Sequence, residues 1–151
     1  MNKAQQSLVN SLNKARTLYS SGGGGVLLAK LIKMRNRVVY ACDIGISAQI
    51  APDCVFHHSG LGVVIGDYVT IGSGCQIYSN VCLGVKGNRK NDGNPEIGNN
   101  VTIGTGAIVL GNIKIGNNVV IAAGSVVLDD VPDNVMVAGN PAVIKKRIET
   151  G

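Results

Sequence analysis

Residues 97–127 read IGNNVTIGTGAIVLGNIKIGNNVVIAAGSVV, and an aliphatic residue recurs in this stretch at every sixth position. The recurring residues are Ile97, Ile103, Val109, Ile115, Ile121 and Val127. Four positions after each of them comes a small or β-branched residue: Val101, Ala107, Ile113, Val119, Ser125 and Val131. Neither an α-helix, whose period is 3.6 residues, nor a hairpin sheet, whose period is two, produces this spacing. The stretch therefore predicts a coil whose sides are six residues long.

A period of six is typical of a triangular prism, in which each hexad makes one short strand and one corner. Three hexads then close a coil of about 18 residues. The aliphatic residue points inward, and the corners need the positive φ that Gly and Asn tolerate. The pairs Asn99-Asn100 and Asn117-Asn118 lie one coil apart and are expected to stack. The predicted fold is all-β, a left-handed parallel β-helix of hexapeptide repeats.

The same period extends back to residue 44 with two interruptions. Its earlier members are Ile44, Ile50, Phe56, Ile65, Ile71, Ile77 and Leu83. The first interruption separates Phe56 from Ile65 and contains both histidines of the chain. The second runs from Gly84 to Glu96 and must leave the prism as an extruded loop. Polar segments on a rigid scaffold are where function concentrates, so we expect the site near these interruptions.

Residues 1–40 lack the repeat. Leu8, Leu12 and Tyr19 are spaced like one face of a helix, and an apolar, basic segment at 26–40 follows a Gly-rich break. We expect short N-terminal helices that pack on the β-helix or on a partner subunit, with docking on a membrane surface as the alternative. The predicted divisions are a helical segment at 1–40, the β-helix at 41–132 with its extruded loop at 84–96, and a C-terminal tail at 133–151.

The composition narrows the class of protein. Hydrophobic residues make up 45% of the chain, charged residues 15%, and Gly occurs 21 times, as expected for a core of small aliphatic residues with tight turns. No stretch reaches the roughly 20 apolar residues of a membrane span. The polar N-terminus carries no secretory signal, so we expect a cytoplasmic protein, with the inner face of the membrane as the alternative location. The net charge of +5 favours an anionic partner such as a phosphorylated cofactor. We expect no nucleic acid, because the chain has no Trp and one Phe on which bases could stack.

The cysteines and histidines suggest acid–base chemistry rather than a metal site. The four cysteines, at 42, 54, 75 and 82, have no CxxC spacing and are expected to be small buried residues. Adjacent side chains on a strand point opposite ways, so at most one of His57 and His58 should face a given cleft. Asp43 lies 15 residues before His58, nearly one coil. Its carboxylate could therefore meet the imidazole across neighbouring strands and stabilise the protonated form.

Several segments together resemble the serine acetyltransferase branch of the hexapeptide acyltransferases, which includes short relatives that acetylate cell-surface polysaccharides. The resemblance covers residues 38 to about 145. It is carried by Asp43-Ile44, His57-His58, GVVIG at 62–66, LG at 83–84, residues 94–116, AAGSVVLDDVP at 122–132 and GNPA at 139–142.

The resemblance implies a catalytic dyad in which His58 is the general base and Asp43 holds its imidazole. Backbone N–H groups near Gly84 and Val85 would stabilise the oxyanion. The implied acceptor contacts are His57, Asp92 and Asn94, and the implied CoA contacts are Thr105, Ala123, Lys145 and Lys146. The two lysines could equally form a solvated basic tail. The resemblance also implies acetyl-CoA as co-substrate, no metal, and a homotrimer with active sites between subunits.

The chain departs from the family pattern where the acceptor should bind. The family has an Asp before its catalytic His, where this chain has His57, and an Arg-His pair in the loop, where this chain has Gly93 and Asn94. The turn at 59–62 is also one residue longer. A zwitterion such as serine binds poorly without charged partners. We therefore predict an O-acetyltransferase acting on a sugar hydroxyl of a cell-surface polysaccharide or its precursor, with serine O-acetyltransferase of cysteine biosynthesis as the alternative.

Two other proteins built on this prism fit less well. A γ-type carbonic anhydrase needs three suitably spaced histidines for zinc, and this chain has two adjacent ones. An ice-binding β-helix needs a flat face of repeated Thr, whereas Thr70 and Thr102 are isolated.

Overall fold

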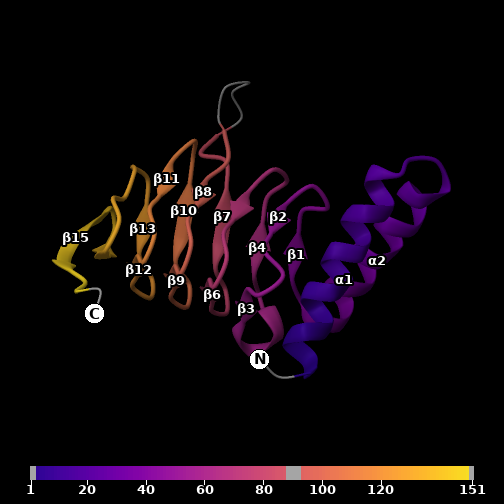
Figure 1. Cartoon of the computed structure of the whole chain (residues 1–151), viewed down its shortest axis with the longest axis horizontal. Helices are drawn as coiled ribbons and strands as arrows, with labels where there is room; N and C mark the ends of the chain where they lie inside the picture. The colour runs from indigo at the N-terminus through magenta and orange to yellow at the C-terminus, as the bar shows by residue number, and fades with distance from the viewer. Residues whose placement is uncertain (1–2, 88–92, 150–151) are drawn as a thin grey trace.

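The computed structural model describes residues 3–87 and 93–149, and it forms a β-helix with two helices at one end (Figure 1). Three sheets make the sides of the prism. Sheet A contains β1 (Asp43–Ile44), β4 (Val64–Ile65), β7 (Cys82–Gly84), β10 (Ile108–Leu110) and β13 (Val126–Val127). Sheet B contains β2 (Gln49–Ile50), β5 (Thr70–Ile71), β8 (Glu96–Ile97) and β11 (Lys114–Ile115). Sheet C contains β3 (Val55–Phe56), β6 (Gln76–Ile77), β9 (Thr102–Ile103), β12 (Val120–Ile121), β14 (Val135–Gly139) and β15 (Ala142–Arg147). The predicted left-handed parallel β-helix is confirmed.

The core is built from the two sets of residues that define the repeat. Every aliphatic or Phe position from Ile44 to Val127 is buried, and so are the small or β-branched residues four positions later in the uninterrupted hexads, from Ala48 to Val131. Even Ser125, the polar member of the second set, is 1% exposed. The aliphatic residues stack on their equivalents one coil away, as Ile71 does on Ile97 and Ile97 on Ile115. Burial of these small side chains accounts for the lack of large aromatic residues.

The corners between sheets B and C are held by ladders of Asn side chains. Asn100, Asn118 and Asn134 have φ of 54°, 55° and 59°, the left-handed region that Asn tolerates better than most residues. Asn100 Nδ2 donates to Asn118 Oδ1 at 3.2 Å, and Asn118 Nδ2 donates to Asn134 Oδ1 at 2.8 Å. The predicted stacking of the two Asn pairs is confirmed.

We expect Asn118→Ala to lower the free energy of unfolding by about 1–3 kcal/mol. The substitution removes two side-chain hydrogen bonds and leaves an alanine at positive φ. Asn118→Gly loses the same hydrogen bonds but tolerates the φ, so it should cost less. Urea unfolding followed by circular dichroism, at one protein concentration, measures both losses. Equal losses in the two variants would show that the backbone conformation contributes nothing.

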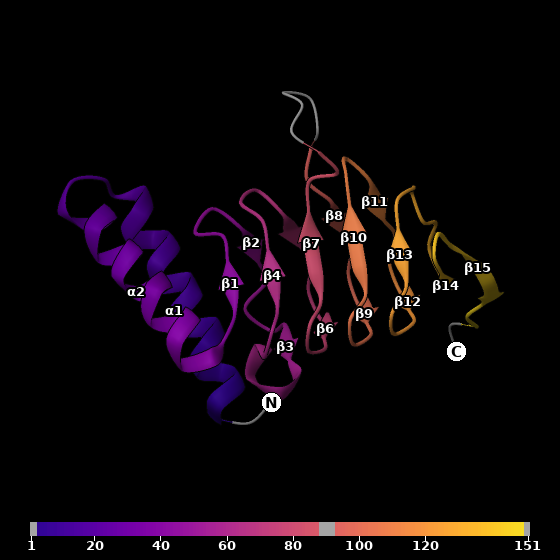
Figure 2. The same cartoon turned by 180° about the vertical axis from the view of Figure 1, so that it is seen from behind.

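Two helices precede the prism, as predicted. The helices α1 (Lys3–Ser20) and α2 (Gly24–Tyr40) pack against each other, and both lie beyond β1 (Figures 1 and 2). Leu8 and Val9 of α1 are buried in the hydrophobic core of the prism. On α2, Ala29 and Asn36 are buried, and Asn36 Oδ1 accepts a 2.9 Å hydrogen bond from Ser11 Oγ on α1. The helices therefore close the N-terminal end of the core.

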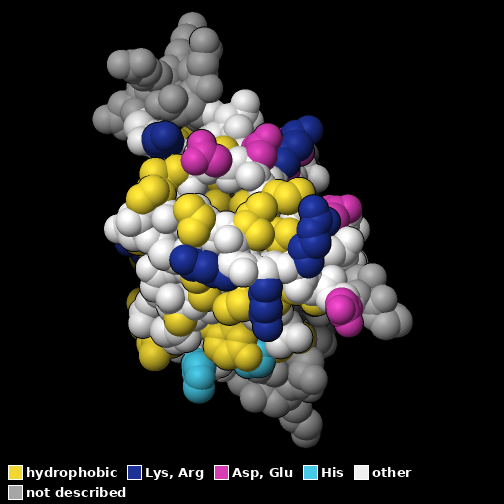
Figure 3. Space-filling view, turned by 90° about the vertical axis from the view of Figure 1, so that its left-hand side faces the viewer, with side chains coloured by type: hydrophobic (Ala, Val, Ile, Leu, Met, Phe, Trp, Pro, Cys, Tyr) yellow, Lys and Arg dark blue, Asp and Glu magenta, His cyan; other side chains and the backbone are white. Residues whose placement is uncertain are grey.

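The segment predicted as a C-terminal tail is β-structure over most of its described length. β14 continues sheet C beside β12, and β15 folds back on β14 as its antiparallel partner. Val143 and Ile144 of β15 are each 53% exposed. Figure 3 shows this end of the molecule, where hydrophobic side chains lie among Lys and Arg.

Two insertions set the register of the prism. Paired strands in the regular coils are 18 residues apart, as Val64 and Cys82 are. The offset rises to 21 residues between Asp43 and Val64, because the histidine segment is inserted between them. It rises to 26 between Thr70 and Glu96, because the second interruption, between Gly84 and Glu96, adds residues to that coil. Both predicted interruptions therefore fall at corners, where they leave the strand ladders intact.

Candidate functional site

The two histidines lie on a tight turn, η1 (His57–Gly60), between sheets C and A. They lie outside the strands, so strand alternation does not decide which way their side chains point, and the expectation that at most one faces a given cleft stays a prediction. His58, Ser59 and Gly60 have φ of 51°, 57° and 76°. Gly60 is also tightly enclosed, because a Cβ there would lie 2.8 Å from Leu8 Cδ2 on α1. The N-terminal helix and the core thus fix the path of the turn.

His57 is held by two residues of the next coil. Its ring stacks on Tyr78, with ring centroids 4.0 Å apart and planes inclined by 11°. Its Nε2 lies 3.2 Å from Gln76 Oε1. The stack and the hydrogen bond restrict the ring to one orientation, so the half-buried imidazole presents a fixed polar edge. Sequence inspection missed Tyr78 and Gln76. Their place one coil after the histidine turn is the pattern that could have revealed them.

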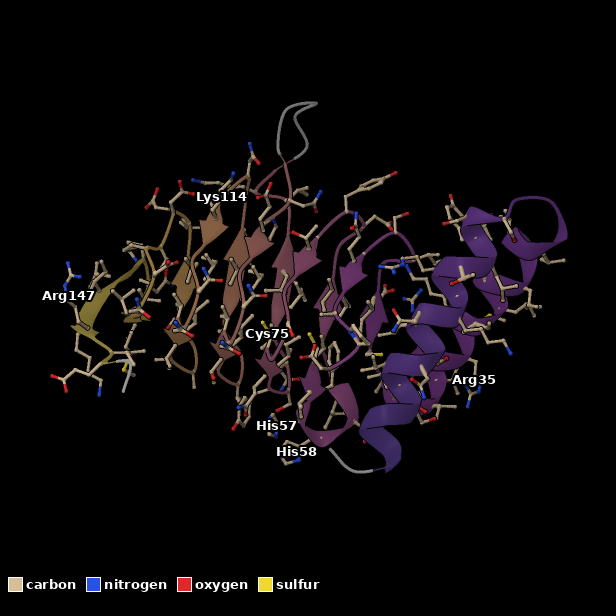
Figure 4. The ribbon with its side chains drawn as sticks, in the orientation of Figure 1. Arg35, His57, His58, Cys75, Lys114 and Arg147 are labelled. Carbon is tan, nitrogen blue, oxygen red and sulfur yellow. The ribbon has the colours of Figure 1, made fainter. Side chains whose placement is uncertain are left out.

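His58 is exposed at the rim of the same turn. Figure 4 shows both histidines at the lower margin of the prism. Within residues 3–87 and 93–149, the structure gives the His58 imidazole no hydrogen bond or ion pair, in contrast to His57. Its ring nitrogens are therefore available to a substrate hydroxyl.

Asp43 does not meet His58 in this structure. Its strand partner is Val64, because the inserted turn lengthens the coil beyond the predicted spacing. Its carboxylate instead lies 3.1 Å from Lys33 Nζ and 3.6 Å from Arg37 Nη2, both on α2. The expected contact across neighbouring strands is thus absent among the described residues, and the dyad stays a prediction.

A small open pocket lies beside Asp43. Arg37, Cys42, Gly62 and Val64 line it together with the carboxylate. The pocket begins where η1 ends, because Leu61 and Gly62 lead from the turn into sheet A. A polar ligand that entered it would reach one carboxylate and one guanidinium.

The predicted CoA contacts lie in three places, at the two edges of sheet A and on sheet C. Thr105 and Ala123 lie on the same edge as η1, which we call the histidine edge. Backbone hydrogen bonds of 2.9 Å link its coils, from Asn80 N to Leu61 O, from Gly106 N to Ser79 O and from Gly124 N to Thr105 O. Thr105 and Ala123 are both exposed there. Lys145 and Lys146 lie elsewhere, on β15 of sheet C.

Gly84 and Val85 lie on the opposite edge, at the end of β7, where the second interruption of the repeat begins. A Cβ on Gly84 would meet nothing within 4 Å, so the surface above it is open. Asn94 returns to this corner, with its Oδ1 3.2 Å from the position of a Cβ on Gly66. Asp92 lies outside the described residues. One chain therefore presents the histidines and the predicted oxyanion donors at opposite ends of the sheet A strands (Figures 1 and 2).

The outer face of sheet A is more apolar than that of sheet B. Its outward row is Asp43, Val64, Cys82, Ile108 and Val126. The corresponding row on sheet B is Gln49, Thr70, Glu96 and Lys114, in which the last two form a 3.6 Å ion pair. Val64 is 46% exposed despite its apolar side chain. Sheet A is thus the face of the prism better suited to contact another protein surface.

The cysteines are not poised for chemistry. Burial raises the pKa of Cys42 to about 11, and burial also raises the pKa of the Cys82 thiol. Cys54 and Cys75 are fully buried, and their thiols donate to the carbonyls of Gly72 and Gly98. All four are free. In the described part of the chain, no three residues among His, Cys, Asp and Glu are placed to hold a metal ion.

Comparison with known proteins places the prism in a family. Residues 94–129 match the family model described as bacterial transferase hexapeptide (six repeats). A serine acetyltransferase of Staphylococcus xylosus is 44% identical over 121 residues, which are 80% of this chain and 56% of that protein. Serine acetyltransferase 2 of Arabidopsis thaliana is 41% identical over 126 residues, 83% of this chain and 39% of the relative.

A solved structure is also similar to this chain. The serine acetyltransferase of Brucella abortus in complex with coenzyme A superposes with a TM-score of 0.87 at 34% identity. The match covers 95% of this chain and 56% of the Brucella chain. The chain thus spans about half the length, or less, of the relatives it matches.

Proposed function

This chain belongs to the hexapeptide-repeat transferase family, on its serine acetyltransferase branch, and from that premise we propose that it transfers the acetyl group of acetyl-CoA to an acceptor hydroxyl. The observation that carries the proposal is identity of 41–44% to serine acetyltransferases over about four-fifths of the chain. The coenzyme A bound to the Brucella relative supports acetyl-CoA as the donor.

L-Serine is the acceptor that the comparisons support best. Both relatives described above are named for it, and each matches about four-fifths of this chain. The polysaccharide acceptor, which the sequence alone favoured, has less support from these similarities. Lys86 remains beside the loop corner as a cation that could meet the serine carboxylate.

The proposed chemistry is direct transfer. His58 takes the proton of the acceptor hydroxyl as its oxygen attacks the thioester carbonyl of acetyl-CoA. N–H groups near Gly84 and Val85 donate to the oxyanion that forms. When the tetrahedral intermediate collapses, the C–S bond breaks and the CoA sulfur takes the proton back from the imidazolium. Asp43 would orient His58 and stabilise its charge, once it gives up part of its contact with Lys33 and Arg37.

We propose a homotrimer with active sites between subunits. Since His58 and Gly84 lie at opposite ends of sheet A, a site that uses both needs the loop corner of one copy beside the histidine edge of another. The apolar outer row of sheet A, including Val64, Ile108 and Val126, supports burial of this face in such an assembly. Thr105 and Ala123 would then border the groove that receives the pantetheine arm of CoA.

An uncharged hydroxyl, as on a sugar, is a second candidate acceptor, and local residues favour it. Position 93 cannot readily hold a cationic side chain, because a Cβ there would lie 2.6 Å from Asn112 Cγ. His57, whose Nε2 contacts Gln76, and Asn94 are hydrogen-bonding groups of the kind that binds hydroxyls. The absence of an Arg at Gly93 is the specific feature that distinguishes this chain from the family pattern.

We propose the cytoplasm as the compartment, because acetyl-CoA is available there. No helix among the described residues is long and apolar enough to cross a membrane.

We expect L-serine to be acetylated with a kcat/KM at least about 100-fold above that for any free sugar, nucleotide sugar or oligosaccharide, since a site built for one set of polar groups rejects acceptors that leave them unpaired. Release of free CoA from acetyl-CoA, measured with each acceptor side by side, tests this. A higher kcat/KM for a saccharide would replace serine with the second candidate. No CoA release with any acceptor, together with no thermal stabilisation by millimolar CoA, would contradict the acyltransferase itself.

A further inference from the structure

The outward face of α2 is apolar and uncovered. Among the exposed hydrophobic residues of α2 are Leu27 (65% exposed), Leu31 (47%), Met34 (58%) and Val38 (80%). Their spacing of four, three and four residues places them on one stripe of the helix. The opposite side, with Ala29 and Asn36, is the side that is buried. This stripe is therefore not needed to attach α2 to the rest of the chain, and it is a large apolar surface for a protein to expose.

Positive charge surrounds the stripe. At 100° per residue, Lys30 and Arg37 lie along one side of it and Arg35 along the other. Lys30 and Arg35 are exposed, and no ion pair engages either of them among the described residues. Arg37 also contacts Asp43, while Lys33 points toward the prism and pairs with the same carboxylate.

The whole N-terminal region has the same sign of charge. Residues 1–42 hold seven of the 14 Lys and Arg and none of the nine Asp and Glu, the first of which is Asp43. A second copy of the chain docked through α2 would bring like charges together with no acidic residue of this region to balance them. An anionic bilayer offers both an apolar interface for the stripe and phosphate groups for the cations.

We propose that α2 docks on the surface of an anionic lipid bilayer. The helix lies in the plane of the interface, with Leu27, Leu31, Met34 and Val38 in the boundary between headgroups and acyl chains. Lys30 and Arg35 extend sideways to the lipid phosphates, each strengthening binding about fivefold. Because the helices lie at one end of the prism (Figure 1), this leaves the histidine edge free for substrates. The inference does not depend on the identity of the acceptor or on acetyl transfer.

Cosedimentation of the full chain with vesicles tests the proposal. Binding to vesicles of phosphatidylcholine mixed with phosphatidylglycerol should exceed binding to phosphatidylcholine alone, and should weaken as salt is raised. Lys30→Gln with Arg35→Gln should reduce binding about 25-fold, which is the fivefold loss expected for each of two cations. The matched control, Lys145→Gln with Arg147→Gln, removes two cations from the far end of the prism and should change binding less than twofold.

The apolar stripe is tested by Leu31→Gln with Val38→Gln, at two exposed positions. Circular dichroism and the thermal midpoint check that the variant folds. This variant should lose vesicle binding while sedimentation equilibrium without lipid shows the oligomer of the parent chain. The proposal is overturned if the variant forms a different oligomer and the parent chain binds neither kind of vesicle. The stripe would then be a contact between copies of the chain. Equal binding to the two kinds of vesicle would overturn it as well.

Discussion

Replacement of His58 by alanine is expected to lower kcat by about 10²–10⁴, the usual contribution of a general base. The imidazole is exposed at the rim of the histidine edge, and no described side chain hydrogen-bonds to it. It can therefore accept a proton from a bound hydroxyl. The KM for acetyl-CoA should change little, because Thr105 and Ala123 lie on other coils of the same edge. Steady-state kinetics at saturating acetyl-CoA measures the loss.

His57→Ala is the matched comparison, because it removes the neighbouring imidazole from the same turn. Loss of the stack on Tyr78 and of the contact with Gln76 should mainly raise the KM for the acceptor. Asp43→Asn should lower kcat by less than His58→Ala does, because Asp43 orients the base and transfers no proton. If His57→Ala abolished turnover while His58→Ala spared it, the roles of the two histidines would be the reverse of those proposed.

The prism could be predicted because one physical constraint repeats along the chain. Each strand has one inward position that must be apolar. Because each side of the prism takes one hexad, this choice recurs every six residues, and the stacking of coils repeats it every 18 residues. The corner residues also repeat from coil to coil, since Asn100 and Asn118 have the same positive φ and hydrogen-bond to each other. The periodicity alone therefore predicts which side chains are buried.

The surroundings of the histidines could not be predicted in the same way, because they lie where the period fails. Asp43 and His58 are separated by nearly one regular coil, but the inserted turn pairs Asp43 with Val64. The cations that bind Asp43 come from α2, which lies outside the repeat. The Tyr78 ring supports His57 through a contact between coils whose corners differ in length. Such pairings depend on the geometry of an irregular segment, on which a repeat carries no information.

The core supports the histidine turn through Phe56, so we expect Phe56→Ala to destabilise the chain strongly. Phe56 is 0% exposed and is the largest fully buried side chain of the described residues. Its ring lies directly under the turn, 3.6 Å from the position that a Cβ on Gly60 would occupy, and Leu8 of α1 packs on the same point. We expect the substitution to lower the free energy of unfolding by about 3–5 kcal/mol, since it leaves a cavity that β3, α1 and η1 cannot all move to fill.

Urea unfolding at one protein concentration measures this loss, and native-state hydrogen exchange shows where it acts. Exchange should accelerate most in α1 and η1, which lose their common contact, and least in β12 and β13 at the other end of the prism. Val55→Ala is the control, because Val55 precedes Phe56 on the same strand but is only partly buried. It should cost about 1 kcal/mol or less. If the two substitutions destabilised the chain equally, Phe56 could not be the contact that joins the N-terminal helix, the histidine turn and the core.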